Sequence, residues 1–303
     1  MRGRFRVEVP RETKDILMPA TTPEPAPLVE SIVHPTDFSA SSERAFAHAL
    51  AIALLRRTRL MLLHVGSDPE WDKFPAVRRT LERWQLLEPG SSQTQVLEQC
   101  GIRVAKLEIP GRSTAAAVAG YLDRDPVDLL VVATEGREGL ARWLHGSVAE
   151  AMARRSRTMT LFVPADAKRE IVSLTDGNLT LKNVLIPVDA SPDPSAAIEF
   201  ARRAAAFLGD GQVTITLLHV GAAFDGARTQ VQDGERFRFH RVLRDGDPVE
   251  RILAEADAIQ AELIVMATEG RTGVFDMLRG STTEQVLRRA PCPLLAVPAQ
   301  PAS

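Results

Sequence analysis

The sequence lacks the features of secreted, membrane-spanning and nucleic-acid-binding proteins. It has only two cysteines, Cys100 and Cys292, in unlike surroundings, so a disulfide framework is not expected. No apolar run approaches the roughly 20 residues that cross a bilayer, and the N-terminus has no apolar core of a signal peptide. A formal charge of −2 gives no basic surface for nucleic acid. We therefore expect a cytoplasmic protein with neither a membrane nor a nucleic acid as partner.

A five-residue motif occurs twice in the chain. Residues 133–137 and 267–271 both read Ala-Thr-Glu-Gly-Arg, and each copy follows an apolar run. After the glycine of each copy, nine residues precede a Gly-Ser pair, at 146–147 and at 280–281. Each serine has a glutamate three residues later, which is the spacing of a helix capping box. A buried strand, a glycine loop and a helix start place backbone N–H groups where an anion can bind. The duplication indicates two such places in two homologous halves.

The apolar pattern around the motif predicts the fold. Each half alternates five short apolar segments with helical segments. Because these segments are runs of Val, Leu and Ile without polar alternation, we expect parallel strands covered on both faces. The fold class is therefore α/β, with two tandem, doubly wound, five-stranded parallel sheets. The expected strands are 31–34, 60–65, 104–109, 128–133 and 159–163, and then 183–187, 213–220, 237–243, 262–267 and 294–297.

The same pattern sets domain bounds. Residues 29–165 and 181–298 are the two predicted domains, joined by a polar linker at 166–180. Residues 1–28 form an N-terminal extension, either a mobile tail or a tail with one short edge strand. Residues 66–100 have no counterpart in the second half, and only one helix, with Val77, Leu81 and Trp84 on one face, is expected there.

The carboxyl ends of parallel strands are where ligands bind in this fold class. Asp37 and Asp189 follow the first strand of each half, where a carboxylate can accept ribose hydroxyls or cap a helix. Val65 and Val220 end the second strand of each half, where free backbone groups can pair with an adenine edge. His64 and His219 precede these valines, and we interpret them as packed side chains and not metal ligands.

The loops supply the remaining candidate residues. Gly136 and Gly146 offer uncrowded N–H groups, Ser147 adds a hydroxyl at a helix start, and Arg137 adds charge. The alternative for one copy alone is an ordinary turn followed by an ordinary helix cap, but the duplication favours a ligand site. The equivalent residues of the second half are Gly270, Arg271, Gly280 and Ser281, preceded by Arg279.

Together these motifs resemble the universal stress protein family in its tandem form. In that family the ATP-binding loop has the pattern Gly, two residues, Gly, nine residues, Gly, then Ser or Thr. Both halves keep the second and third glycines and the serine, but Ala133 and Ala267 replace the first glycine. The resemblance implies a Rossmann-like fold, ATP as ligand with or without Mg²⁺, and a role as a stress-response sensor or regulator with an unidentified protein partner. It also implies that the last strands, 159–163 and 294–297, pair within the chain as an internal pseudo-dimer. Further pairing into a homodimer stays open.

Three alternatives to a nucleotide-binding regulator stay open. A slow ATPase is one, since a bound nucleotide with Mg²⁺ can lose its γ-phosphate. An adenylyl-transferring enzyme of the same fold is another, although the chain has no Ser-Gly-Gly loop. The third is a folded protein-interaction module that has lost nucleotide binding. No metal-spaced His/Cys cluster, nucleophile elbow or Walker lysine occurs, so a dedicated enzyme is not expected.

Two finer expectations concern single residues. We expect the second half to bind nucleotide more tightly, because Arg279 stands near the end of its loop where the first half has His145. A guanidinium is charged at any physiological pH, whereas a histidine is mostly neutral at pH 7. Cys292 lies between two prolines before a buried strand, so we expect a packed thiol.

Overall fold

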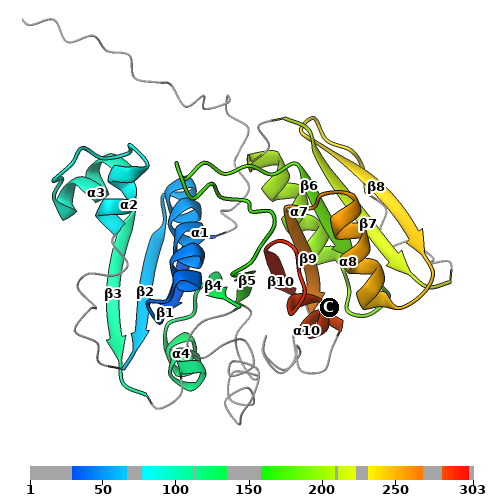
Figure 1. Cartoon of the computed structure of the whole chain (residues 1–303), viewed down its shortest axis with the longest axis horizontal. Helices are drawn as coiled ribbons and strands as arrows, with labels where there is room; N and C mark the ends of the chain where they lie inside the picture. Colours follow the sequence, from blue (N-terminus) through cyan, green and yellow to red (C-terminus); the bar gives the residue numbers. More distant parts are fainter. Residues whose placement is uncertain are drawn as a thin grey trace, which may run out of the picture.

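We analysed a computed structural model of the chain, which describes residues 29–66, 77–111, 114–134, 158–208, 211–222, 231–268 and 282–299. These residues form one ten-stranded sheet with the order β3-β2-β1-β4-β5-β10-β9-β6-β7-β8. Figure 1 shows this order from β3 at the left to β8 at the right. None of the described helices is long and apolar enough to cross a membrane.

The first half contributes five parallel strands in the order β3-β2-β1-β4-β5. The strand order reverses between β1 and β4, as in other doubly wound sheets. Its elements are β1 (Ser31–Thr36), α1 (Ala40–Arg56), β2 (Arg59–Val65), α2 (Val77–Arg83), α3 (Gln93–Cys100), β3 (Arg103–Ile109), α4 (Thr114–Arg124), β4 (Leu129–Ala133) and β5 (Met159–Val163).

The second half repeats this arrangement. Its strands are again parallel, and β6 lies between β7 and β9 as β1 lies between β2 and β4. Its elements are β6 (Asn183–Pro187), α7 (Ser195–Leu208), β7 (Val213–Val220), β8 (Phe237–Arg244), α8 (Pro248–Ala258), β9 (Leu263–Thr268), α10 (Thr282–Leu287) and β10 (Leu294–Pro298).

The two halves join through their last strands. β5 and β10 run antiparallel, with Leu161 opposite Leu295 and Thr160 opposite Ala296. This confirms the predicted internal pseudo-dimer, in which the halves are related by an approximate twofold axis at this junction. The two separate sheets expected from the sequence therefore form one continuous sheet.

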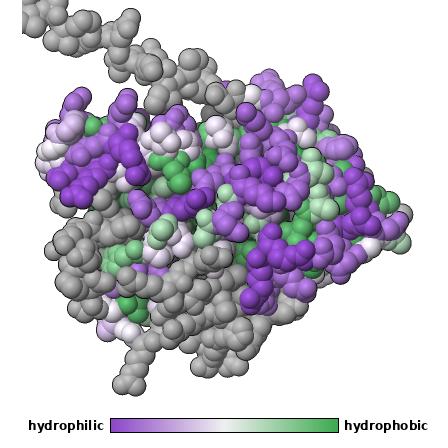
Figure 2. All heavy atoms as spheres, viewed as in Figure 1, coloured by the Kyte–Doolittle hydropathy of each residue, from purple (hydrophilic) through white to green (hydrophobic). Residues whose placement is uncertain are grey.

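The sheet is covered on both faces, as the apolar runs predict. Residues 129–132 of β4 are each at most 3% exposed. Alternate side chains enter two different cores, because successive strand residues point to opposite faces. Leu161 packs in the core that includes α1 and α7, and Phe162 packs in the core that includes α4 and α8. Figure 2 shows that hydrophilic residues (purple) cover most of the described surface on the side of Figure 1.

The start of α1 follows from local sequence. Ser39 is the N-cap, and its hydroxyl accepts a hydrogen bond from the Ser42 N–H at 3.2 Å. This satisfies one of the free amide groups at the helix start. Three residues therefore separate the end of β1 from the start of the helix, and Asp37 lies in this short connection.

Two features of the structure differ from the prediction. β1 continues through Pro35 to Thr36, because Pro35 still pairs in register with Leu63 of β2. A helix that was not predicted, α3, follows α2, and it begins with a capping box between Ser92 and Gln95. The spacing of that pair was a usable signal in a segment with little helical periodicity.

The linker is more integrated than its polar composition indicates. Ile171 and Val172 are buried in the core beside α1 and α7. Its turn lies at Asp176-Gly177, as predicted, and Gly177 has φ +73°. The indole N–H of Trp84, which directly follows α2, donates to Leu174 O at 3.2 Å. The linker therefore packs against the first half and is not a free tether.

Candidate functional site

The candidate site of each half lies where its first two strands end. Asp37 follows β1 and Val65 ends β2, while Asp189 follows β6 and Val220 ends β7. Because β1 and β2 are parallel neighbours, as are β6 and β7, their carboxyl ends are adjacent. The structure therefore brings these predicted residues together in two equivalent pairs.

A histidine bridges the two strand ends in each half. The His64 Nδ1 lies 3.0 Å from Thr36 O, and the His219 Nδ1 lies 3.1 Å from Val188 O. Each ring therefore ties the second strand to the last residues of the first. This agrees with the interpretation of both histidines as structural, and the described residues contain no group of three or more side chains suited to a metal ion.

Two glycines complete these strand ends, and the sequence analysis missed both. Gly66 and Gly221 follow the valines with φ +122° and +140°, which side chains rarely adopt. The Gly66 N–H donates to Ile109 O at 3.0 Å, and the Gly221 N–H donates to Arg244 O at 2.9 Å. The repeated sequence Leu-His-Val-Gly carried the signal for both positions.

The first half supports its site with a buried polar network. The Ser42 hydroxyl donates to Thr36 Oγ1 at 2.9 Å, and Thr36 Oγ1 also accepts from the Phe38 N–H at 3.2 Å. His34 Nδ1 lies 3.0 Å from Val131 O, and burial lowers the pKa of His34 to about 4. His34 is therefore a neutral imidazole, and the tautomer protonated at Nδ1 can donate a hydrogen bond to Val131 O of β4. The carboxylate of Asp37 accepts from the Ser39 N–H at 3.0 Å, which fixes the turn after β1.

The second half lacks this network. Taking Asp189 as the counterpart of Asp37, the positions of His34, Thr36 and Ser42 hold the apolar residues Ile186, Val188 and Pro194. Asp189 is exposed, and its carboxylate accepts from the Ala190 N–H at 2.7 Å. The second half therefore has the same strand-end arrangement, but apolar residues take the place of the buried polar network around it.

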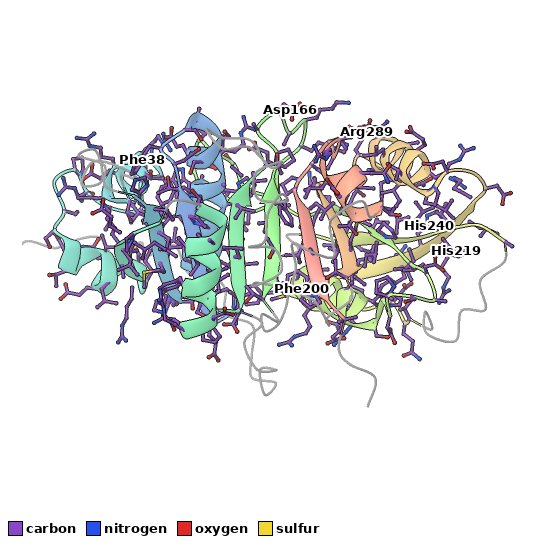
Figure 3. All side chains as sticks on the ribbon, turned by 90° about the horizontal axis from the view of Figure 1, so that it is seen from below. Phe38, Asp166, Phe200, His219, His240 and Arg289 are labelled. Carbon is purple, nitrogen blue, oxygen red and sulfur yellow. The ribbon has the colours of Figure 1, made fainter. Side chains whose placement is uncertain are left out.

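The residue after each aspartate also differs between halves. Phe38 has φ +62°, and its ring centroid lies 4.4 Å from that of His64. In the second half the equivalent residue is Ala190, which is exposed. The His219 Nε2 instead lies 3.0 Å from Ala222 O. Figure 3 shows Phe38 and His219 in the two different halves. A large apolar ring thus covers the bridging histidine only in the first half.

The alanines that replace the family glycine lie in regular strands. Ala133 is the last residue of β4, and Ala267 lies in β9. Neither belongs to the described residues with positive φ, so a methyl group there causes no backbone strain. The remaining predicted site residues lie outside the described residues: Gly136, Arg137, Gly146, Ser147, Gly270, Arg271, Arg279, Gly280 and Ser281.

The fold and the paired strand ends define a tandem α/β protein with one topological switch point in each doubly wound half. The model of the universal stress protein family matches residues 29–164 and 222–298, which is more than half of the chain. The chain therefore belongs to the universal stress protein family. The second matched segment omits β6, α7 and β7, yet these elements occupy the positions of β1, α1 and β2.

Individual relatives agree with the family. One universal stress protein of Methanocaldococcus jannaschii is 40% identical over 60 residues, which is 20% of this chain and 35% of that protein. A second from the same organism is 24% identical over 155 residues, covering 45% of this chain and 95% of that protein. The crystal structure of a universal stress protein from Archaeoglobus fulgidus is 21% identical, with a TM-score of 0.56 over 90% of this chain and 99% of that chain. The chain thus spans about a third of the first of these relatives, and the solved structure shares its fold.

Proposed function

We propose that the chain is a cytoplasmic, nucleotide-dependent regulator of stress adaptation that binds one adenine nucleotide in each half. ATP, with or without Mg²⁺, is the proposed ligand, and an unidentified protein is the proposed partner. The binding units are residues 29–165 and 181–298. The observation that carries the proposal is that both halves build the same strand-end arrangement from an aspartate, a bridging histidine and a Val-Gly pair.

Each residue type has a distinct proposed role. Asp37 and Asp189 accept the ribose hydroxyls, since they follow the first strand at the switch point. The backbone of Val65 and Val220 meets the adenine edge, because it lies where the ladder of β2 and β7 ends.

The phosphates are assigned to the repeated loops, which follow β4 and β9 directly. By their sequence pattern, the glycines and serines at 136, 146 and 147, and at 270, 280 and 281, are the proposed N–H and hydroxyl donors to these phosphates. Arg137, Arg271 and Arg279 add positive charge near the phosphates.

We assign the tighter site to the second half. Arg279 supplies a guanidinium where the first half has His145. The ring contact between Phe38 and His64 supports the same order, since Ala190 leaves more room beside Asp189. A well-formed charge-assisted hydrogen bond contributes about 1.5–3 kcal/mol, which is roughly ten- to a hundredfold in affinity.

Calorimetric titration with ATP tests the proposal on three matched variants. Gly146→Val and Gly280→Val each place a branched side chain in one loop and should each remove one binding event. Gly211→Val is the control, because a side chain at exposed Gly211 meets nothing within 4 Å. The tighter event should disappear in Gly280→Val. Its loss in Gly146→Val would reverse the order of the sites, and unchanged binding in both loop variants would refute the phosphate loops.

The same samples separate the alternative functions. Steady release of inorganic phosphate from added ATP would favour a slow ATPase. Absence of bound nucleotide after acid extraction, together with no binding of added ATP, would favour an interaction module.

A further inference from the structure

An apolar cavity of about 280 Å³ lies at the junction of the two halves. Its floor includes Leu161 and Leu295, which face each other across the antiparallel pair β5–β10. Leu129 of β4 and Leu263 of β9 extend the floor into each half. The cavity therefore sits at the twofold junction, and its volume is at the lower end of small-molecule pockets.

The walls come from the two helices that cover this face and from the linker. Ile52 of α1 and Phe200 of α7 line opposite sides, and Ile171 and Leu179 of the linker also line the cavity. Figure 3 shows Phe200 close to the junction between the halves. Side chains from α1, α7 and the sheet thus surround a space that only the paired halves create.

The cavity is separate from the proposed nucleotide sites. α1 begins beside Asp37, but it is its last residue, Arg56, that lines the cavity. With a rise of about 1.5 Å per residue, this 17-residue helix places its two ends roughly 25 Å apart. In α7 most lining residues likewise belong to the second half of the helix, namely Arg202, Arg203, Ala204, Ala206 and Phe207, and Phe200 lies just before its midpoint.

Positive charge gathers at the cavity. Arg56, Arg202 and Arg203 line it, and its described lining residues include no carboxylate. Arg202 is held by Glu199, with donor–acceptor distances of 2.8 and 2.7 Å. The Arg56 guanidinium lies over the Phe207 ring, with its carbon 4.7 Å from the ring centroid. Its Nε is buried and has no hydrogen-bond partner among the described residues.

We propose that this cavity binds a medium-chain fatty carboxylate, with the alkyl chain against the leucine floor and the carboxylate on Arg56. A buried N–H without an acceptor is costly, and a carboxylate oxygen satisfies it with a charge-assisted bond. The leucines and Phe200 suit an alkyl chain, because they offer no polar group along the floor. The inference goes beyond nucleotide binding and does not depend on it.

Binding is measured by calorimetry of the full chain with decanoate and with 1-decanol. Decanoate should bind roughly tenfold or more tightly than 1-decanol, since only decanoate pairs with Arg56. Shortening the acid to octanoate should weaken binding by about fourfold for each methylene removed. Equal affinities for the acid and the alcohol would overturn the role of Arg56, and no binding of either would overturn the site.

Two arginine variants separate a specific contact from general charge. Arg56→Gln should lower decanoate affinity to that of 1-decanol, while Arg57→Gln, an equal change at an exposed neighbour outside the cavity, should not. Equal losses in the two variants would contradict the proposal. ATP affinity should be unchanged in Arg56→Gln, so the result is independent of the proposed nucleotide sites.

A cross-linking experiment uses the wild-type protein, so its result does not depend on whether a variant folds. A decanoate analogue with a diazirine on its alkyl chain is photolysed on the wild-type protein and the adducts are located by mass spectrometry. Adducts in peptides containing Ile52, Phe200 or Leu295 are expected. Adducts confined to other peptides would overturn the location.

Discussion

Replacing His48 with phenylalanine should make the stability of the chain less sensitive to acid. His48 lies on α1 and is 0% exposed. Burial lowers its pKa from 6.5 to about 4, and the positive charge of Arg44 adds to this, against a hydrogen bond between His48 Nδ1 and Arg44 O. The Nε2 of His48 is buried without a hydrogen-bond partner among the described residues. Phenylalanine is the matched choice, because Phe200 holds the equivalent position of α7.

The sign of the effect follows from the lowered pKa. Below about pH 6.5 the unfolded chain takes up a proton at His48, whereas the folded chain does so only near pH 4. The contribution of His48 to stability is therefore complete above about pH 6.5 and is lost as pH falls toward 4. Between pH 7.5 and pH 5 the loss is about 2 kcal/mol for these pKa values.

Urea unfolding at pH 7.5 and pH 5 measures this difference. The wild type should lose about 2 kcal/mol more unfolding free energy over this interval than His48→Phe. His240→Phe is the control, since it makes the same substitution at an exposed position on β8. The packing cost of the larger ring is the same at both pH values. It therefore cancels when the difference in unfolding free energy between pH 7.5 and pH 5 is compared for the two proteins. If His48→Phe loses as much unfolding free energy between pH 7.5 and pH 5 as the wild type, a neutral, buried histidine at this position is refuted.

Two further predictions test the cysteine and the unequal sites. Cys292 is 0% exposed, and burial raises the pKa of its thiol to about 12. A bulky thiol reagent added to the native protein should therefore label the partly buried Cys100 first. Rapid labelling of Cys292, detected by mass spectrometry, would contradict this. Phe38→Ala, which copies Ala190, should raise ATP affinity of the first half by about two- to tenfold, the size of one aromatic contact. It is measured in the Gly280→Val background, and a fall in affinity would instead mean that Phe38 stacks on the base.

The fold was predictable because its strands carry a strong signal. The apolar runs of β5, β6 and β7 have the bounds expected from the sequence. A strand buried on both faces needs apolar residues at every position, which few other segments can satisfy. The junction was also predicted, since the last strands β5 and β10 pair as the family resemblance implies.

Features that depend on backbone conformation or tertiary packing were less predictable. α3 has weak periodicity, and its start rests on the pair Ser92 and Gln95. The positive φ of Phe38 could not be read from the sequence, because aromatic residues rarely adopt it. The positive φ of Gly66 and Gly221 accompanies hydrogen bonds from their N–H groups to the neighbouring strands, and these contacts exist only in the folded sheet. The burial of Ile171 depends on the halves being paired, which composition alone does not report.

The two helices α1 and α7 connect the proposed sites in a way that neither half alone provides. Each begins just after the aspartate of one nucleotide site, and each ends at the shared cavity. At that end Arg56 of α1 lies over Phe207 of α7, so the two helices touch each other across the junction. A ligand in the cavity would contact both helices at once, whereas a nucleotide would contact the start of only one. If a fatty carboxylate alters ATP affinity, linkage requires that ATP alter carboxylate affinity by the same factor. The junction of the halves is therefore the place where a second ligand could bias both nucleotide sites together.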